Sequence, residues 1–255
     1  MKYAIFASAL MMLCLASGCA SKRMSYSEDA AFAKKASRPI RAADPQEIAM
    51  ANLPILKKKA TDKGLIVLDA GHGGEDFGTH SVGQPIYQEK YLNLATTQLV
   101  KNFLTQFGYK VILTRSDDTF ISLDQRALFA NEQNPKLFVS IHYNSAPSAD
   151  AEGIEVFYYK EDEDKTRVNQ SKALAAAILK RTLDNTKAKS RGVKHGNYAV
   201  IRQTNMPAVL IEGGFLTNKD EMEKIKDGAY MKSLALGIAQ GIQDYISKEP
   251  LIADK

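Results

Sequence analysis

The sequence predicts an α/β fold, a single domain with a mostly parallel twisted sheet flanked by helices. Short apolar segments typical of buried strands alternate with longer segments whose apolar residues recur at helical spacing. The 255 residues can hold one sizeable domain and a targeting segment, and a hydrophobic content of 45% is that of a globular protein. No internal repeat interrupts the alternation, so we expect one structural unit.

Six short segments are rich in β-branched, aromatic or other apolar residues and are predicted to be strands. The first is Leu65-Ile66-Val67-Leu68, and a glycine-rich loop at 71–74 follows it. In chain order, the predicted strands are 65–68, 110–114, 137–141, 154–158, 198–201 and 208–211.

The segments between the strands show the spacing of amphipathic helices. The predicted helices are 89–107, 122–131, 170–183, a helix that begins near 219, and 231–247. Gly108 ends the first of these, as glycine often does at helix C-termini. Ser122 and Gln125 have the spacing of a capping box, and Asn218 is a predicted N-cap.

The first 19 residues resemble the signal peptide of a bacterial lipoprotein. Lys2 precedes an apolar stretch, 3–15, that is too short for a transmembrane helix. The stretch ends in Leu15-Ala16-Ser17-Gly18-Cys19, which resembles a lipobox whose cysteine becomes the lipidated first residue of the mature protein. We therefore expect a lipid anchor on Cys19. The alternative is ordinary cleavage nearby, with Cys19 removed or left free.

The positive charge of the chain is concentrated in a predicted tether at 20–61. This segment has nine Lys/Arg and four Asp/Glu, a net charge of +5, and 1–19 carries +1. Subtracting both from the whole-chain charge of +5 leaves −1 for the rest, which argues against a nucleic-acid-binding domain. A basic tether suits anionic lipid or wall polymer, although a solvated linker has the same composition. We place a catalytic domain at 62–248 and a tail at 249–255.

The two cysteines exclude one class of metal site. Cys14 and Cys19 both lie in or at the end of the signal segment, so the domain has no disulfide and no cysteine ligand. Any metal must therefore be bound by His, Asp or Glu.

Three candidate catalytic residues, His72, His142 and Glu212, follow predicted strands. Ligands of open α/β sheets bind outside the carboxyl ends of the strands, so these side chains are expected to meet. Glu89 lies on the apolar stripe of its helix, where a carboxylate is costly unless it is paired or bound to a metal. Its place in the first helical turn offers another explanation.

These four residues suggest a metal site without proving one. Two histidines and a carboxylate form a familiar catalytic zinc set, and a fourth acid can act as the base. Each histidine alone also fits an ordinary position in the core or at its rim. No H-E-x-x-H motif is present.

Five segments resemble, in order, the motifs of the zinc-dependent N-acetylmuramoyl-L-alanine amidases of the amidase type 3 family. They are 69–78 (DAGHGGEDFG), 89–94 (EKYLNL), Arg126 with Ala130-Asn131, 140–145 (SIHYNS) and 209–218 (VLIEGGFLTN). The resemblance runs from about Gly64 to Tyr245 and implies the α/β fold predicted above.

The resemblance also implies roles for individual residues. His72, Glu89 and His142 would bind Zn²⁺, and Glu212 would be catalytic. Residues with a supporting role, toward the site or the substrate, would be Asn144, Arg126 and Asp69. Asp69 would orient a zinc ligand or serve only as a turn residue.

Three further positions match the family less closely. His80 and His195 match no metal position, and we expect them at the surface. Gly213 stands where many members have Thr or Val, a departure next to Glu212.

The activity implied is hydrolysis of the amide between N-acetylmuramic acid and the L-alanine of the stem peptide, by zinc-activated water with Glu212 as the base. Two alternatives remain: a non-catalytic wall-binding lipoprotein on an amidase fold, and a zinc carboxypeptidase acting elsewhere on the stem peptide. A serine carboxypeptidase is disfavoured because the chain has no Ser-x-x-Lys motif.

We expect a monomer whose partners are peptidoglycan and, through the lipid anchor, a membrane, and which binds no nucleic acid. The expected location is the periplasm, and Ala20 after the lipidated cysteine favours the outer membrane. Some family members carry an inserted helix that blocks the site. Here the interval between His142 and Glu212 holds one clear helix, 170–183, so we expect an open site.

Overall fold

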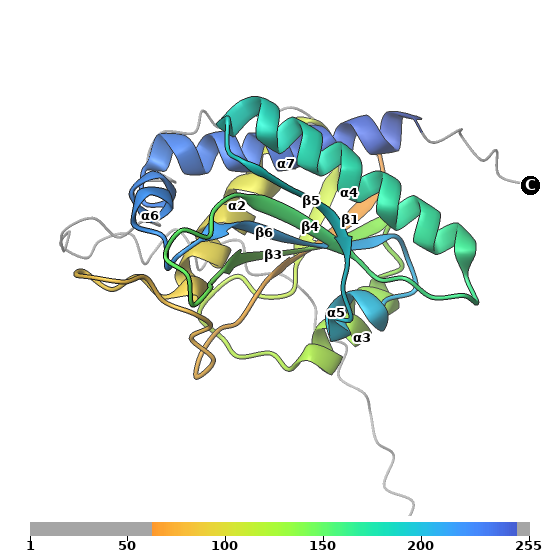
Figure 1. Cartoon of the computed structure of the whole chain (residues 1–255). Coiled ribbons are helices and arrows are strands. Elements are labelled where there is room, and N and C mark those ends of the chain that lie inside the picture. Colours follow the sequence, from red (N-terminus) through yellow and green to blue (C-terminus); the bar gives the residue numbers. More distant parts are fainter. Residues whose placement is uncertain (1–62, 249–255) are drawn as a thin grey trace, which may run out of the picture. The chain divides into compact units, whose positions relative to one another are not determined.

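The computed structural model describes residues 63–248 as an α/β domain (Figure 1). The predicted signal peptide with Cys19, the basic tether and the C-terminal tail lie outside the described residues. A six-stranded sheet has the order β2-β1-β3-β6-β4-β5. All neighbouring strands are parallel except β4 and β6, so the predicted fold class is confirmed. The strands are β1 Leu65–Ala70, β2 Lys110–Leu113, β3 Leu137–Asn144, β4 Ile154–Tyr158, β5 Ser190–His195 and β6 Ala208–Phe215.

Helices cover the two faces of this sheet unequally, as Figure 1 shows. Three long helices pack on one face, and α3 and the short α5 lie on the other. The helices are α2 Glu89–Gln106, α3 Leu123–Gln133, α4 Lys165–Thr186, α5 Ala199–Arg202, α6 Lys219–Ile225 and α7 Gly228–Lys248. None of the helices in the described part of the chain is both long enough and apolar enough to cross a membrane.

The larger apolar core lies under α2, α4 and α7. Alternate residues of the central strands, such as Leu68, Ile141 and Ile211, are fully or almost fully buried there. The close contact of α4 with α7 depends on glycine, because a Cβ on Gly241 would lie 2.4 Å from the Cα of Ile178. This face is therefore sealed.

The opposite face has a smaller apolar cluster formed by residues such as Val67, Phe138 and Leu210 with Ile201 of α5. Side chains on a strand alternate between faces. Asp69, which is two positions after Val67, and Glu212, which is two positions after Leu210, therefore point to this less covered face. The fold thus places polar residues where helices leave room.

Three of the predicted strands extend further than expected, to Ala70, Asn144 and Phe215. His142 and Glu212 consequently lie inside β3 and β6 rather than just past them, whereas His72 does follow the end of β1. The capping box of Ser122 with Gln125 is confirmed. The side chain of Asn218 accepts a hydrogen bond from the first turn of α6, as predicted for its N-cap.

The last third of the domain differs from the prediction in two places. The predicted strand at 198–201 is wrong, because α5 lies there, and β5 was not predicted at all. Edge strand β5, Ser190–His195, has only one apolar residue, Val193, so its sequence resembles a loop. Helix α4 also extends beyond the predicted 170–183 at both ends.

Candidate active site

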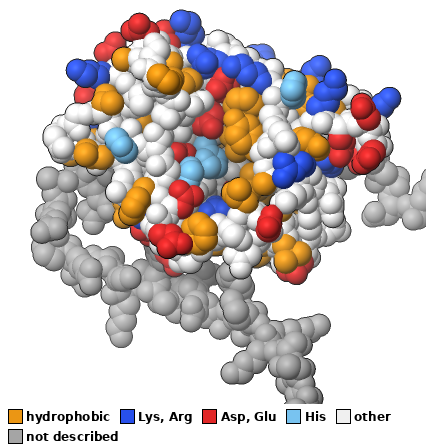
Figure 2. Space-filling view, turned by 60° about the horizontal axis from the view of Figure 1, so that its bottom comes forward, with side chains coloured by type: hydrophobic (Ala, Val, Ile, Leu, Met, Phe, Trp, Pro, Cys, Tyr) orange, Lys and Arg blue, Asp and Glu red, His pale blue; other side chains and the backbone are white. Residues whose placement is uncertain are grey.

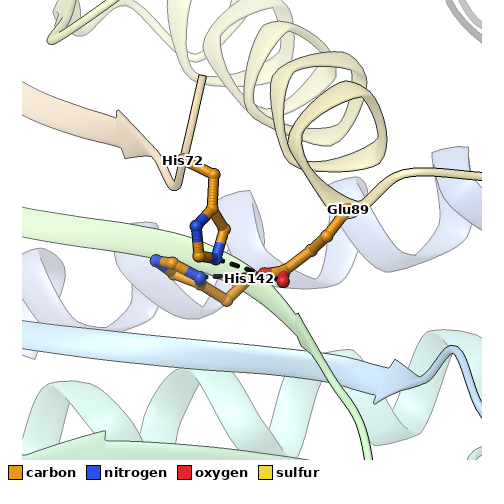
Figure 3. Close-up of side chains that lie close together, drawn as sticks. All are labelled: His72, Glu89 and His142. Carbon is orange, nitrogen blue, oxygen red and sulfur yellow. Dashed lines mark hydrogen bonds and ion pairs between the residues drawn. The ribbon is translucent and has the colours of Figure 1, made fainter. Parts of the chain in front are cut away.

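The three predicted metal ligands lie together at the carboxyl edge of the sheet (Figure 3). His72 follows β1, Glu89 is the first residue of α2, and His142 lies in β3. His72 Nε2 is 3.1 Å from one carboxylate oxygen of Glu89, and His142 Nδ1 is 2.9 Å from the other. The two imidazole rings meet edge to face, with centroids 4.9 Å apart. Residues 70 positions apart in the sequence thus form one cluster.

This cluster fits a metal ion. One donor atom from each residue lies within 4.8 Å of the other two. A zinc ion about 2.0–2.1 Å from each donor requires separations of about 3.3 Å in a tetrahedral site. The two histidines lie 3.1 and 2.9 Å from different oxygens of Glu89, so small side-chain adjustments would bring one donor of each residue to that spacing. Histidine nitrogens and a carboxylate oxygen are also the ligands that catalytic zinc uses, with one position left for water.

The loop that carries His72 has an unfavourable backbone conformation, which contacts with neighbouring residues must stabilise. His72 has a φ of 60°, which is uncommon for any residue other than glycine. Gly71 leaves room for the second histidine, since a Cβ there would lie 2.1 Å from the ring of His142. The sequence DAGHGG therefore combines a ligand with the glycine that allows its partner to approach.

Two buried arginines hold the backbone of this loop. Arg126 donates to the carbonyl oxygens of Ala70 and His72 at 2.6 and 2.7 Å, and to Asp69 at 2.8 Å. Arg115 donates to the carbonyl oxygens of Ala70 and Gly71 at 2.9 and 2.7 Å. The two guanidinium groups thus hold three consecutive carbonyls that end at the ligand itself.

Arg115 also links this loop to the helix of the second ligand. Its Nη2 donates to the carbonyl oxygen of Lys90 at 2.8 Å, next to Glu89. One buried side chain therefore fixes the backbone beside two of the three ligands. Burial, together with the nearby charge of Arg126, lowers the pKa of Arg115 to about 10, so the guanidinium stays protonated at neutral pH.

Asp69 does not contact a ligand side chain through any of its hydrogen bonds. It is fully buried and accepts hydrogen bonds from Arg126, Thr114 and Ser140. Burial alone would raise its pKa, but the charge of Arg126 and these hydrogen bonds outweigh burial and lower it. Asp69 is thus the charge partner of Arg126 and acts on His72 only through that arginine.

Asp76 makes the direct contact that orients His72. Its carboxylate lies 2.7 Å from His72 Nδ1, which directs Nε2 toward Glu89. Burial lowers the pKa of His72, but the hydrogen bonds and charges of Glu89 and Asp76 raise it above its ordinary value. An aspartate on the far nitrogen is the usual way in which a metal-binding histidine is oriented.

The carboxylate of Glu89 is fixed by several donors. The backbone N–H of Thr79 donates to it at 2.9 Å, the backbone N–H of Tyr143 at 3.2 Å and the side chain of Asn93 at 3.1 Å. Burial would raise its pKa, yet the hydrogen bonds and charges of His142 and His72 lower it far below the ordinary value. The group is therefore an anion ready to receive a cation.

Glu212 lies one strand from this cluster, on the same face of the sheet. It is paired in register with His142 of the neighbouring β3. Its residue exposure is only 8%, and its Oε2 is buried without accepting a hydrogen bond from the described residues. Burial, with smaller contributions from the charges of Glu89 and Glu155, raises its pKa well above the ordinary value. A perturbed carboxyl in a cleft is a candidate general base.

A cleft opens over these residues. Figure 2 shows histidine side chains in the middle of this face, with acidic side chains beside them and hydrophobic side chains around. Two cavities of about 420 and 410 Å³ share His72 and His142. The first extends between α3 and α5 toward Phe120 and Arg202. The second extends over Glu212 and Asn144 to Tyr198, so the histidines lie where two arms meet. Besides the histidines, its polar lining residues are Thr79, Glu89, Tyr143, Asn144, Ser145, Tyr198 and Glu212.

A family model described as N-acetylmuramoyl-L-alanine amidase matches residues 66–244. The chain belongs to this family. An N-acetylmuramoyl-L-alanine amidase from Clostridium difficile is 38% identical, with a TM-score of 0.68 over 73% of this chain and 98% of that one. The catalytic domain of CwlV, an amidase from Bacillus (Paenibacillus) polymyxa var. colistinus, is 39% identical, with a TM-score of 0.66 over 72% and 98%.

A longer relative gives the same result. The probable cell wall amidase LytH of Staphylococcus epidermidis is 34% identical over 182 residues, which are 71% of this chain but only 58% of LytH. The enzyme class is thus that of an N-acetylmuramoyl-L-alanine amidase, with peptidoglycan as the substrate.

Sequence reasoning missed three polar residues of the amidase site. Arg115 comes two residues after β2 at the carboxyl edge of the sheet, so the rule that selected His72 would have found it. Asp76 follows His72 by four positions within the first motif. Glu155 was hidden because its strand, β4, runs antiparallel to β6, and its position near Glu212 depends on that pairing.

The remaining predicted residues of the amidase are also placed. Asn144 lines the second arm of the cleft and donates to Glu155 at 2.8 Å, while His80 and His195 are exposed as expected. A Cβ on Gly213 would lie 3.0 Å from the ring of Tyr143, and Gly213 has no left-handed φ. A larger side chain at this position would therefore press against the Tyr143 ring.

Proposed function

We propose that the chain hydrolyses the amide between N-acetylmuramic acid and the L-alanine of the stem peptide, with zinc as its metal and Glu212 as its base. The observation that carries this proposal is the arrangement of the site. His72, Glu89 and His142 form a metal-type cluster, and the buried carboxyl of Glu212 lies on the adjacent strand and the same face. Family membership supports the same bond.

Zinc bound by this set would polarise the amide carbonyl and acidify a water molecule. Glu212 takes the proton from the attacking water, because its Oε2 has no other hydrogen-bond donor among the described residues. The water oxygen forms the new C–O bond as the C–N bond breaks. Glu212 then returns the proton to the leaving amine of L-alanine. The raised pKa of Glu212 suits a group that must hold the proton between these steps.

Metal analysis tests the ligand assignment. The purified protein should contain one zinc ion per chain, and His72→Ala or His142→Ala should lose both the metal and the activity. His195→Ala is the matched control, because that histidine is exposed and distant from the cluster in the sheet order. Full zinc content in both ligand variants would refute the assignment.

We propose further that the protein is a monomeric periplasmic lipoprotein, anchored through Cys19 in the outer membrane. The lipobox-like end of the signal segment and the basic tether, both within 1–61, support this location. The unchanged protein should sediment with outer membranes and incorporate a labelled fatty acid, and Cys19→Ala should incorporate none. An unchanged protein without label would contradict the lipid anchor.

The cleft is proposed to be active without a partner protein. Between His142 and Glu212, the helices of the described chain are α4 and the four-residue α5. Helix α4 packs against α7 on the covered face, away from the cleft. The purified protein should therefore cleave peptidoglycan at its full rate, and a strict need for an activator would contradict this proposal.

A further inference from the structure

Beyond Glu212, the same face carries a second buried carboxylate, Glu155 of β4. Glu155 lies opposite Glu212 in the antiparallel pairing and opposite Gly192 of β5. Because directly opposed residues of paired strands share a face, Glu155 points toward the face of the cleft. Its side chain is only 4% exposed.

Two cations from the edge strand hold this carboxylate. Arg191 Nε donates to Glu155 Oε2 at 3.0 Å, and the ammonium of Lys194 donates to the same oxygen. The other oxygen accepts from Asn144, which lines the cleft. A continuous hydrogen-bonded group therefore connects the edge strand to the active site.

The group has more positive than negative charge. One carboxylate faces two cations, which leaves a formal charge of +1. The side chains of Arg191 and Lys194 are 33% and 42% exposed, so solvent and a ligand can reach them. A guanidinium has five N–H donors and an ammonium three. The contacts with Glu155 and the Glu152 carbonyl leave several of these donors for another acceptor.

Protection of an edge strand does not explain this arrangement. Edge strands carry lysine so that other chains cannot pair with them, and Lys189 has that character, with a side chain 66% exposed in a surface ion pair with Glu152. Arg191 and Lys194 instead turn inward over Glu155. A single cation would already neutralise that carboxylate.

The rest of the cleft is unfavourable for an anion. Its lining includes five acidic residues, Asp69, Asp76, Glu89, Asp124 and Glu212. One lining cation, Arg126, is paired with Asp69, and the other, Arg202, donates to Asn197 in the first arm. Because a bound metal ion would be engaged with the amide carbonyl and water, the cationic side chains for a substrate carboxylate beyond the second arm are those at β5.

We propose that Arg191 and Lys194 bind a carboxylate of the stem peptide and so determine which stem peptides the enzyme cleaves, an inference that rests on the proposed function. Neighbouring strands are about 4.8 Å apart, so Glu155 lies about 10 Å from His142, two strands away. An extended peptide advances about 3.3–3.6 Å per residue. The carboxylate therefore belongs to one of the first three or so residues after the cleaved amide.

This placement also orients the substrate. The peptide runs from the second arm of the cleft past Asn144, which contacts Glu155, and on toward β5. The sugar then occupies the first arm, between α3 and α5, where Phe120 and Leu123 offer apolar surface.

Two soluble muropeptides test the proposal. They are identical except that the second stem residue bears a free carboxylate in one and a carboxamide in the other. The wild-type protein should cleave the carboxylate form with a kcat/KM about 10- to 100-fold higher, mainly through KM, because charge-assisted hydrogen bonds are the strong ones. In Arg191→Gln/Lys194→Gln, this preference should disappear, so that the two forms have about the same kcat/KM.

Two further variants separate binding from folding. Glu155→Gln/Arg191→Gln/Lys194→Gln removes all three charges, leaves no uncompensated buried anion, and should also lose the preference. Glu155→Gln alone frees both cations and should raise the preference above that of the wild type. Lys180→Gln, at an exposed position of α4, changes the net charge by −1 as the triple variant does and should leave the preference unchanged.

The outcomes distinguish the two proposals. Two results would refute the role of Arg191 and Lys194 but leave the proposed function intact. One is equal cleavage of both muropeptides by the wild type, and the other is an unchanged preference in the double and triple variants. Cleavage of neither muropeptide would contradict the proposed function. In that case, calorimetric binding of the two free stem peptides decides the inference, which requires tighter binding of the carboxylate form and loss of that difference in the double variant.

Discussion

The face of the sheet under α2, α4 and α7 and the face under α3 and α5 use alternate residues of the same strands. On the first face, Ile141 and Ile211 are buried in an apolar core closed by three long helices. On the second, their neighbours His142 and Glu212 line an open cleft. The period of two in a strand lets one segment stabilise the fold and present reactive groups at the same time.

The two faces also differ in how the burial of side chains affects the stability of the fold. Each fully buried Leu or Ile side chain on the covered face stabilises the fold by about 1.5–3 kcal/mol. On the cleft face, Glu212 is buried without a hydrogen-bond donor to its Oε2 among the described residues, which opposes folding. Activity and stability should therefore respond differently to substitutions on the two faces.

The largest effect is expected for Glu212→Gln on the cleft face. Loss of the base should lower kcat about 10²- to 10⁴-fold, while zinc content stays at that of the wild type. Glu223→Gln, at an exposed position of α6, is the control and should keep full activity. A Glu212→Gln variant that hydrolyses muropeptide at the normal rate would remove the contrast between the faces.

On the covered face, Gly241→Ala should lower stability without changing the chemistry. Alanine is the better helix former by about 1 kcal/mol, but its Cβ would meet the backbone of Ile178 at 2.4 Å. The expected result is a net loss of about 1–3 kcal/mol in the free energy of unfolding, with kcat per folded molecule unchanged. Denaturant unfolding should show no such loss for Ser247→Ala on the exposed side of α7, and equal stability of both variants would refute close helix packing.

Asp76→Asn sharpens the comparison at the metal site. Because Asp76 orients His72, the affinity for zinc should fall about 10- to 100-fold, which competition with a chromophoric chelator measures. The stability of the metal-free protein should change by no more than about 0.5 kcal/mol, since Asp76 is partly exposed. Glu75→Gln, at the exposed neighbouring position, should keep the wild-type affinity, and an equal fall in both variants would point to a general charge effect.

The smallest effect is a pH-dependent gain in stability for Glu212→Gln in the metal-free protein. Burial raises the pKa of Glu212 above its ordinary value of 4.5, so the unfolded state releases this proton more readily than the folded state. The wild type therefore loses stability as pH rises above about 4.5, and the variant does not. Urea unfolding at several pH values should show an advantage for the variant that grows toward neutral pH; a constant difference would contradict the raised pKa.

The sequence predicted the covered face better than the cleft face, for physical reasons. Segments such as Leu65–Leu68 are apolar because both of their faces are covered, and helices such as α2 have a clear period. Ser190–His195 has no such pattern, since its pairing with β4 and its contacts with Glu155 determine its structure. Local sequence therefore resembles a loop where long-range pairing makes a strand.

The candidate site was also predicted only in part. The strand-end rule and the family motifs identified His72, Glu89, His142 and Glu212, and the first three do form one cluster. The role of Arg115 depends on hydrogen bonds to three backbone carbonyls distant in sequence. The strand-end rule would mark Arg115 as a candidate, but no spacing of residue types encodes those contacts, so its role is visible only in the structure.

Mass spectrometry of purified peptidoglycan digested by the intact protein, with and without a chelator, tests the central claim most directly. A zinc-dependent amidase should release free stem peptides that begin with L-alanine, release none in the chelator, and release them again when zinc is added. Peptides shortened elsewhere in the stem would indicate the carboxypeptidase alternative, and undigested peptidoglycan would indicate a wall-binding protein. Either result, or the same products in the presence of the chelator, would contradict a zinc-dependent amidase.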